Sequence, residues 1–461
     1  MPTATESMNT PAILEAHEPL AARIARSAAS ATLDGLPAEV PQKVKVCLLD
    51  LIGCAFESRD LPWSRQAAAL AQRVADGASI IGAPDPTTPA DAAFANAVMG
   101  HGLVREDMHA GSISHLGIVV LPTLLALAQT RRVSGRDFIV AAAVGYEAGG
   151  QVGRAVMDAE VARIHRPTGI TGPIAGAAAG ARLLGLDVDQ ATSALALAAN
   201  TTLGFNQWAH TGGSEMFFQA GFAARNALTA VRLAELGAFA SPSALDGEAG
   251  LFAALRKRSA ASKVELFRGA PEILSVYHKP VPACNFAQTA SQAALAIAGA
   301  RRWAPERIAS IVVRVSRAAA LYPGCDYTGP FAHVLQAKMS IQYNVAAALI
   351  EGGVSEQNFT LLTDPRLHRL IGLMTLEVDD QMTHAYPARQ GSEVEVRTVD
   401  GEAQRVHLDD VVNATASEVR ERFRAAVEGA LGAARAREIE RCIDGLESNE
   451  DAGRLGGLLR A

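Results

Sequence analysis

The sequence is poor in cysteine and in aromatic residues, and each shortage argues against a class of protein. Its five cysteines, an odd number in 461 residues, include no C-x-x-C pair. This pattern argues against a disulfide framework, a zinc ribbon and a cysteine-ligated cluster, and it favours a reducing compartment. Aromatic residues make up only 5% of the chain while alanine and leucine are abundant, which favours packed helices over sheets.

Long apolar runs and an excess of positive charge are also missing. No apolar run is unbroken enough to cross a bilayer, and the acidic start of the chain lacks the features of a secretory signal. Roughly the first 15 residues are predicted to be disordered. The net charge is −6 and no basic stripe stands out, so nucleic acid is not expected as a partner. We therefore expect a cytoplasmic protein without a membrane partner. A small anionic substrate is compatible with the negative net charge, because local arginine and lysine side chains matter more for its binding.

The residues suited to proton transfer gather in one stretch, residues 99–121, which reads MGHGLVREDMHAGSISHLGIVVL. Apolar, alanine-rich runs on both sides predict helices, and the glycines and serines within it favour a loop. The stretch holds three of the chain's 11 histidines, with carboxylates between them. Because histidine titrates near neutral pH, this combination suits general acid-base chemistry. A solvated loop between two helices is the alternative interpretation.

Periodicity predicts how the chain is divided. Apolar residues recur at helical spacing over most of residues 1–265 and again over 406–461. In between, residues 308–315 and 392–398 alternate like strands, with helical patterns among them. We therefore predict a mainly α fold: a large all-helical domain, which the C-terminal segment rejoins, with a smaller α+β domain inserted over 266–405.

Small residues predict one close helix contact. Gly172, Gly176 and Gly180 are spaced by four, so one face of their helix is nearly bare and a neighbouring helix can approach it. No G-x-G-x-x-G follows a predicted strand, so no dinucleotide site is expected. A further helix is predicted over residues 222–236, after a polar break.

Eight stretches, in order over nearly the whole chain, resemble the MmgE/PrpD family: LLDLIGCAFES, AAFANAVMGHGLVREDMH, HLGIVVLPTLLALAQ, RPTGITGPIAGAAAGARLLGLD, AGFAARNAL, KPVPACNF, SIQYNVAAALIEG and AYPARQGSEVEV. The resemblance implies the same two-part fold, an active site between the parts, a homodimer and no organic cofactor. It also implies chemistry that begins by removing a proton beside a carboxylate of a small di- or tricarboxylate. Activities in the family include 2-methylcitrate dehydratase, cis-aconitate decarboxylase and iminodisuccinate epimerase.

The resemblance points to four candidate catalytic residues. His115 matches a family histidine and is the first choice for a general acid or base. Lys279 matches the lysine of K-P-x-P-x-C and is a candidate for stabilising an enolate-like oxyanion. Asp107 matches the last Asp of D-F-D-D-T, and Tyr343 matches the tyrosine of S-x-x-Y-x-V-A. A capping role for Asp107 and a core position for Tyr343 remain open.

Further candidates concern substrate binding. Arg105 and Arg166 are candidate carboxylate clamps, because guanidinium binds carboxylates through two hydrogen bonds. His109 and His165 are additional candidates, and His165-Arg166-Pro167-Thr168 is interpreted as a shifted form of the family's G-F-H-P-T. Structural roles remain open for all four. The histidine spacing matches no recognised ligand set, so no metal is predicted, and Cys284 is interpreted as a packed thiol.

Several family positions are replaced. Val104 and Met108 stand where D-F-D-D-T has its first Asp and its Thr, and Met216 and Gln219 stand where T-K-x-x-H has its Lys and His. We predict a cofactor-independent lyase of the 2-methylcitrate dehydratase type. An epimerase of the iminodisuccinate type is the alternative, since reprotonation needs no acid for a leaving hydroxyl group. A catalytically inactive binding protein is the second alternative. The exact substrate and the number of bases remain open.

Overall fold

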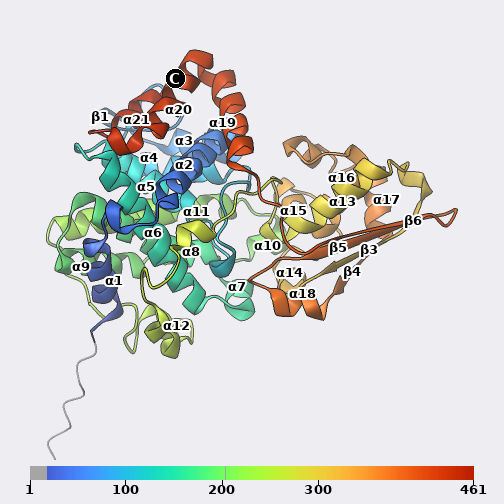
Figure 1. Ribbon diagram of the computed structural model, residues 1–461, viewed down its shortest axis with the longest axis horizontal. Coiled ribbons are helices and arrows are strands. Elements are labelled where there is room, and N and C mark those ends of the chain that lie inside the picture. Colours follow the sequence, from blue (N-terminus) through green and yellow to red (C-terminus); the bar gives the residue numbers. More distant parts are fainter. Residues whose placement is uncertain (1–17, 203) are drawn as a thin grey trace, which may run out of the picture.

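In the computed structural model, which describes residues 18–202 and 204–461, the chain forms a large helical lobe and a smaller lobe with a sheet (Figure 1). The predicted mainly α fold with a smaller α+β region is confirmed. The start of the chain, predicted to be disordered, lies outside the described residues. Within the described ranges, no helix combines the length and hydropathy that a membrane crossing requires.

The large lobe contains the helices of the first half of the chain and the last helices of the second half. Their bounds are α1 (Leu20–Ser30), α2 (Glu39–Ser58), α3 (Pro62–Leu70), α4 (Pro89–His101), α5 (Gly117–Ala128), α6 (Gly135–Val156), α7 (Ala159–Ile164), α8 (Pro167–Leu184), α9 (Val188–Ala199), α10 (Trp208–Thr211), α11 (Glu215–Glu235), α12 (Leu251–Ala254), α19 (Ala416–Leu431), α20 (Ala433–Asp444) and α21 (Arg454–Leu458). Strands β1 (Arg73–Ser79) and β2 (Pro86–Thr87) pair antiparallel at its edge.

Helix α5 is the centre of this lobe, because every one of its residues is buried. A helix that is apolar on all sides needs neighbours all round, and α4, α6, α8 and α11 supply them. The bare face of α8 admits two of these neighbours. A Cβ on Gly176 would lie 2.6 Å from Cβ of Ala227 on α11 and 3.3 Å from Oγ1 of Thr123 on α5. The predicted close helix packing is thus confirmed.

The smaller lobe is a four-stranded sheet with helices around it. Its strands are β3 (Ile308–Val315), β4 (Met374–Val378), β5 (Ser392–Thr398) and β6 (Ala403–Leu408), and its helices are α13 (Gln288–Ala300), α14 (Arg317–Leu321), α15 (Val334–Met339), α16 (Ile341–Glu351), α17 (Pro365–Gly372) and α18 (Asp380–Ala385). The strand order is β4-β3-β5-β6, and only the β3–β4 pair is parallel among the four strands described here. Helix α13 packs on β5 and β6, and α16 packs on α13. Strands β3 and β5 cover the predicted ranges.

The chain crosses between the lobes twice, and the two crossings lie side by side. The Ala414 N–H donates to the carbonyl oxygen of His278 (2.9 Å), which joins the returning segment to the outgoing one. Helix α19 then packs on α2, where a Cβ on Gly53 would lie 3.1 Å from Cα of Phe423. The boundaries at residues 265 and 405 stay a prediction.

Candidate functional site

A small cavity lies where the two lobes meet. The residues that line it come from both lobes: Val104, Met108, Ile113, His115, Arg166, Trp208 and Met216 from the helical lobe, and Cys284, Asn285, Phe286, Tyr322 and Met339 from the smaller one. A mostly apolar cavity with a few polar groups that converge on it is typical of a small-molecule site. Its position matches the active site that the family resemblance implies.

The loop after α4 supplies one wall of the cavity. Helix α4 ends at His101, and the loop then runs to the start of α5. Met108 and Tyr277 exchange backbone hydrogen bonds of 2.8 and 3.0 Å, which tie the loop to the segment that carries Lys279. The His115 N–H donates to Oγ1 of Thr168 (3.1 Å), which fixes the end of the loop against α8.

Glu106 lies between two imidazole rings, although sequence reasoning did not select it. Its Oε1 is 2.5 Å from Nδ1 of His101 and 2.7 Å from Nδ1 of His115. All three side chains are buried. Because both rings turn Nδ1 to one carboxylate oxygen, we assign the ring proton to Nδ1 in each, which leaves Nε2 as an acceptor. Since His115 lines the cavity, its Nε2 is the nitrogen available to a substrate.

Burial decides the charge of this cluster. It disfavours imidazolium, so it lowers the pKa of His115 to about 3 and also lowers the pKa of His101. Burial alone would raise the pKa of Glu106, but the two histidines hold it well below its usual range. At neutral pH the cluster is therefore one carboxylate between two neutral imidazoles. A neutral histidine with a free Nε2 can accept a proton.

Arg166 brings a positive charge to the cavity wall. Its Nη2 donates to Nε2 of His101 (2.9 Å), which agrees with the proton on Nδ1 of that ring. Its Nη1 lies 3.4 Å from the hydroxyl of Tyr322, and the guanidinium lies 5.7 Å from the centroid of the Trp208 ring. The arginine is thus oriented from three sides and can present its remaining N–H groups to a carboxylate.

Lys279 adds a second cation next to the cavity. It is fully buried, and its Nζ donates to the carbonyl oxygen of Ala283 (3.0 Å). Burial lowers its pKa to about 8, while the Glu106 carboxylate opposes the shift. At neutral pH the site therefore holds two cations and one carboxylate, a balance that favours an anionic substrate.

Two helices of the large lobe hold the Lys279 segment in place. Arg422 of α19 donates through Nη1 to the carbonyl oxygen of Lys279 (2.9 Å). The neighbouring His278 places Nδ1 2.7 Å from Oδ2 of Asp50 on α2. Residues from both ends of the chain thereby position one lysine.

Six of the eight predicted site residues are not among those that line the cavity: Lys279, which lies buried beside it, and Asp107, Tyr343, Arg105, His109 and His165. Asp107 accepts a hydrogen bond from Tyr146 (2.6 Å), and burial raises its pKa to about 6. Tyr343 lies in the core of the smaller lobe, where its hydroxyl donates to the carbonyl oxygen of Asn358 (2.8 Å). The catalytic roles of these two residues stay predictions that the cavity geometry does not support.

The other three have structural partners. Arg105 pairs with Glu57 through both Nη atoms, at 3.0 and 2.5 Å. His109 bridges Ser112 and Glu272, at 2.7 and 2.6 Å. The half-buried ring of His165 lies beside that of Phe205, 5.8 Å between centroids. Their substrate-binding roles also stay predictions.

The side chains of this loop divide between the cavity and other partners. Val104 and Met108 line the cavity and Glu106 holds the cavity's histidine, whereas Arg105 and Asp107 bind elsewhere. The motif match selects Asp107, and the tertiary structure selects its neighbour Glu106.

The stretch interpreted as a shifted G-F-H-P-T lies partly at the cavity. Arg166, which precedes Pro167, lines the cavity, while His165 does not. The shifted match stays a prediction.

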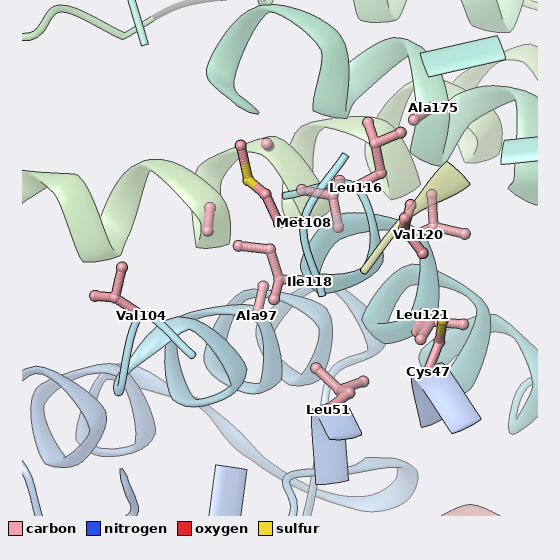
Figure 2. Close-up of a cluster of buried hydrophobic side chains, with 14 of the residues drawn as sticks. Cys47, Leu51, Ala97, Val104, Met108, Leu116, Ile118, Val120, Leu121 and Ala175 are labelled. Atoms are coloured by element: carbon pink, nitrogen blue, oxygen red, sulfur yellow. The ribbon is translucent and has the colours of Figure 1, made fainter. Parts of the chain in front are cut away.

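Three of the four replaced family positions line the cavity, namely Val104, Met108 and Met216, and Gln219 does not. Figure 2 shows Val104 and Met108 in one apolar cluster with Ile118 of α5. Helix α11 begins at Glu215, earlier than predicted, and so carries Met216 to the cavity. These replacements put apolar side chains in the cavity wall where the family has Asp, Thr and Lys.

Two residues of the loop have a strained backbone. Val104 and Ile113 both adopt left-handed conformations, with φ of 57° and 53°. Branching at Cβ makes this region costly for valine and isoleucine, whereas Asp and Asn tolerate it. Strain of this kind gathers at functional sites, and both residues line the cavity.

His101, Glu106 and His115 are also the one group in the described part of the chain whose donor atoms could hold a metal ion, all within 4.8 Å of one another. The hydrogen bond between Glu106 and His101 and the close contact between Glu106 and His115 hold the cluster together, and the Arg166 guanidinium next to His101 opposes a second cation there. The absence of a metal stays a prediction.

Comparisons with known proteins agree with this picture. The MmgE/PrpD N-terminal domain matches residues 22–263, and the MmgE/PrpD C-terminal domain matches residues 281–447. A cis-aconitate decarboxylase of Aspergillus terreus (strain NIH 2624 / FGSC A1156) is 31% identical over 239 residues, 50% of this chain and 49% of the relative. The cis-aconitate decarboxylase-like protein oryM of Aspergillus oryzae (strain ATCC 42149 / RIB 40) is 36% identical over 212 residues, 44% of each chain. The chain spans about half the length of the curated relatives it matches.

Proposed function

Because the chain belongs to the MmgE/PrpD family, we propose that it is a cofactor-independent lyase of small di- or tricarboxylates. The reaction begins with removal of a proton from a carbon beside a carboxylate. Similarity to cis-aconitate decarboxylases supports a lyase of the decarboxylase or dehydratase type. The observation that carries the proposal is the position of His115, whose Nδ1 lies 2.7 Å from Oε1 of Glu106 at a cavity that Arg166 also lines, with Lys279 buried beside it.

His115 serves as the base in this proposal. Its Nε2 accepts the proton, and the imidazolium that forms is stabilised by Glu106, 2.7 Å from Nδ1. The carboxylate of the substrate binds Arg166. Negative charge that develops on the enolate is stabilised by Arg166 and Lys279, which are already oriented before the reaction starts.

Lys279 serves as the acid. With a pKa of about 8 it is mostly protonated at neutral pH, yet it can release its proton. Burial lowers the pKa of both groups, so His115 is neutral and Lys279 is protonated at neutral pH, as a base and an acid require.

Among lyases, loss of carbon dioxide fits this cavity better than loss of water. A leaving hydroxyl group needs a proton donor, and Val104, Met108 and Met216 present none. Carbon dioxide leaves as a neutral, apolar molecule, for which an apolar wall is favourable. A dehydratase would have to use Lys279 for the leaving group.

An epimerase of the iminodisuccinate type is a second candidate, because one base and one acid suffice for removal and return of a proton. The presence of both His115 and Lys279 argues against a catalytically inactive binding protein.

The test is proton NMR in deuterated water with cis-aconitate, 2-methylcitrate, citrate and iminodisuccinate. A decarboxylated alkene product supports the first proposal, a vinyl signal from a hydroxy acid indicates a dehydratase, and deuterium in an intact skeleton indicates an epimerase. The absence of any reaction contradicts all three.

We also propose a homodimer in the cytoplasm, as the family resemblance implies. Phe205 and Phe222 are more than half exposed beside a hollow between α8 and α11. Exposed apolar surface of this kind often marks a protein interface. Light scattering after size-exclusion chromatography is expected to give twice the mass of the chain, and a Phe222→Lys variant is expected to shift toward the monomer.

A further inference from the structure

Two thiols meet in the wall of the cavity. Cys284 lines the cavity and is 4% exposed, whereas Cys325 is 0% exposed behind it. Their Sγ atoms lie 3.5 Å apart, and both cysteines are free thiols. The sequence places these residues 41 positions apart, so no spacing rule could pair them.

The two thiols have opposite electrostatic surroundings. Burial would raise the pKa of Cys284, but a hydrogen bond from Cys325, the Phe286 N–H and the charge of Lys279 together lower it. Burial and the neighbouring Cys284 instead raise the pKa of Cys325 well above its ordinary value. Of the two thiols, the one that faces the cavity, Cys284, therefore loses its proton more readily than Cys325 behind it. A thiolate, not a thiol, is the nucleophile.

We propose that Cys284 is an oxidation site for small hydroperoxides that enter the cavity, and that Cys325 is its resolving partner. The Cys284 sulfur attacks one peroxide oxygen and the O–O bond breaks. Cys284 is oxidised to a sulfenic acid, and the peroxide is reduced to water or an alcohol. The Cys325 sulfur then attacks Cys284, an S–S bond forms, the S–O bond breaks, and water leaves with the Cys325 proton.

The geometry requires little movement for the second step. The Sγ atoms must close from 3.5 Å to about 2.05 Å. Cys284 directly follows Ala283, whose carbonyl oxygen accepts the hydrogen bond from Lys279. A disulfide that draws Cys284 toward Cys325 is expected to disturb Lys279 and to lower turnover reversibly. This last effect rests on the proposed function, whereas the thiol chemistry does not.

The remaining cysteines provide internal controls. Cys47 and Cys54 are buried away from the cavity, and burial raises the pKa of each. Cys442 is half-buried on α20, with a raised pKa. Selective oxidation of Cys284 would thus reflect its site and not exposure alone.

The experiment treats the reduced, full-length protein with a small molar excess of hydrogen peroxide. Free thiols are blocked with N-ethylmaleimide after unfolding, and peptides are mapped by mass spectrometry without reduction. The expected result is a Cys284–Cys325 cross-linked peptide, with Cys47 and Cys54 still free. In Cys325→Ser, dimedone is expected to trap a sulfenic acid on Cys284. Cys442→Ser is expected to leave the cross-link unchanged.

Recovery of both Cys284 and Cys325 as free thiols would overturn the proposal. Oxidation of Cys47 or Cys54 at the same rate would also overturn it, because the selectivity would be lost. Peptide mapping of the wild-type protein tests the proposal even if a variant does not fold. Turnover is measured on the same samples before and after dithiothreitol, and a complete cross-link with unchanged turnover would overturn the link to Lys279.

Discussion

Oε1 of Glu106 lies 2.7 Å from Nδ1 of His115, and both side chains are buried. A carboxylate in this place fixes the tautomer of the imidazole and opposes the charge that forms when Nε2 takes a proton. The same oxygen also binds His101, which in turn accepts a hydrogen bond from Arg166. One carboxylate therefore orients both the base and the substrate-binding cation.

Replacement of Glu106 is expected to affect the rate more than the binding of substrate. Glu106→Gln keeps the size of the side chain but removes its charge, so the imidazolium of His115 loses its partner. We expect kcat to fall on the order of 10²-fold, at the low end of what general base catalysis contributes. Steady-state kinetics and circular dichroism check the rate and the fold. Glu57→Gln, which removes a carboxylate outside the cavity, is the control, and equal effects of both variants would contradict the assignment.

The pH dependence of kcat/KM is expected to have an alkaline limb and no limb near the ordinary pKa of histidine. The pKa of His115 is about 3, so His115 stays neutral and active as pH falls through about 6.5. Lys279 must be protonated to act as the acid, and its pKa is about 8, so activity is lost as pH rises through about 8. In Lys279→Arg the alkaline limb should disappear, since guanidinium does not titrate there. A loss of activity on acidification near pH 6.5 would show that His115 is not buried as described.

Arg166 is expected to determine substrate affinity. Arg166→Lys retains a positive charge but loses the planar guanidinium that binds a carboxylate and the hydrogen bond to His101. We expect KM to rise about tenfold, which corresponds to about 1.4 kcal/mol. Arg105→Lys is the matched control, because Arg105 pairs with Glu57 away from the cavity. An increase in KM with the control and not with Arg166→Lys would reverse the two assignments.

Val104 is expected to influence which group leaves. Val104→Asp places a carboxyl group at the cavity wall and suits the left-handed backbone, where valine is strained. We expect the ratio of dehydration to decarboxylation to rise at least about tenfold, or about 1.4 kcal/mol in relative barrier height. Val104→Asn, with a similar shape and backbone preference but no acidic proton, should show no such rise. NMR product ratios with a hydroxylated tricarboxylate provide the measurement.

Part of the fold and part of the candidate site can be predicted from the sequence. The helical lobe, the bare face of α8 and strands β3 and β5 follow from periodicity, because local patterns determine them. His115 and Lys279 follow from motif matches and lie at the cavity or beside it. Glu106 does not follow from the motif match, because the match selects Asp107 and the direction of a side chain in a bent loop depends on the tertiary fold.

Long-range contacts account for the other differences. Tyr343 matched a family motif, yet the fold places it in the core with Asn358. Cys284 was interpreted as a packed thiol because its partner Cys325 is brought near only by the tertiary structure. The protonation states of His115 and Lys279 likewise cannot be predicted from the sequence, because their pKa values depend on burial in the folded protein.

The most direct test of the central claim is solvent deuterium incorporation by His115→Gln. The wild-type protein with its substrate in deuterated water is expected to give deuterium at the carbon beside a carboxylate. His115→Gln should lose this incorporation while it still binds a saturated tricarboxylate, as measured by calorimetry, because Arg166 and Lys279 remain. Deuterium incorporation at the wild-type rate in His115→Gln would show that another group is the base and would contradict the account.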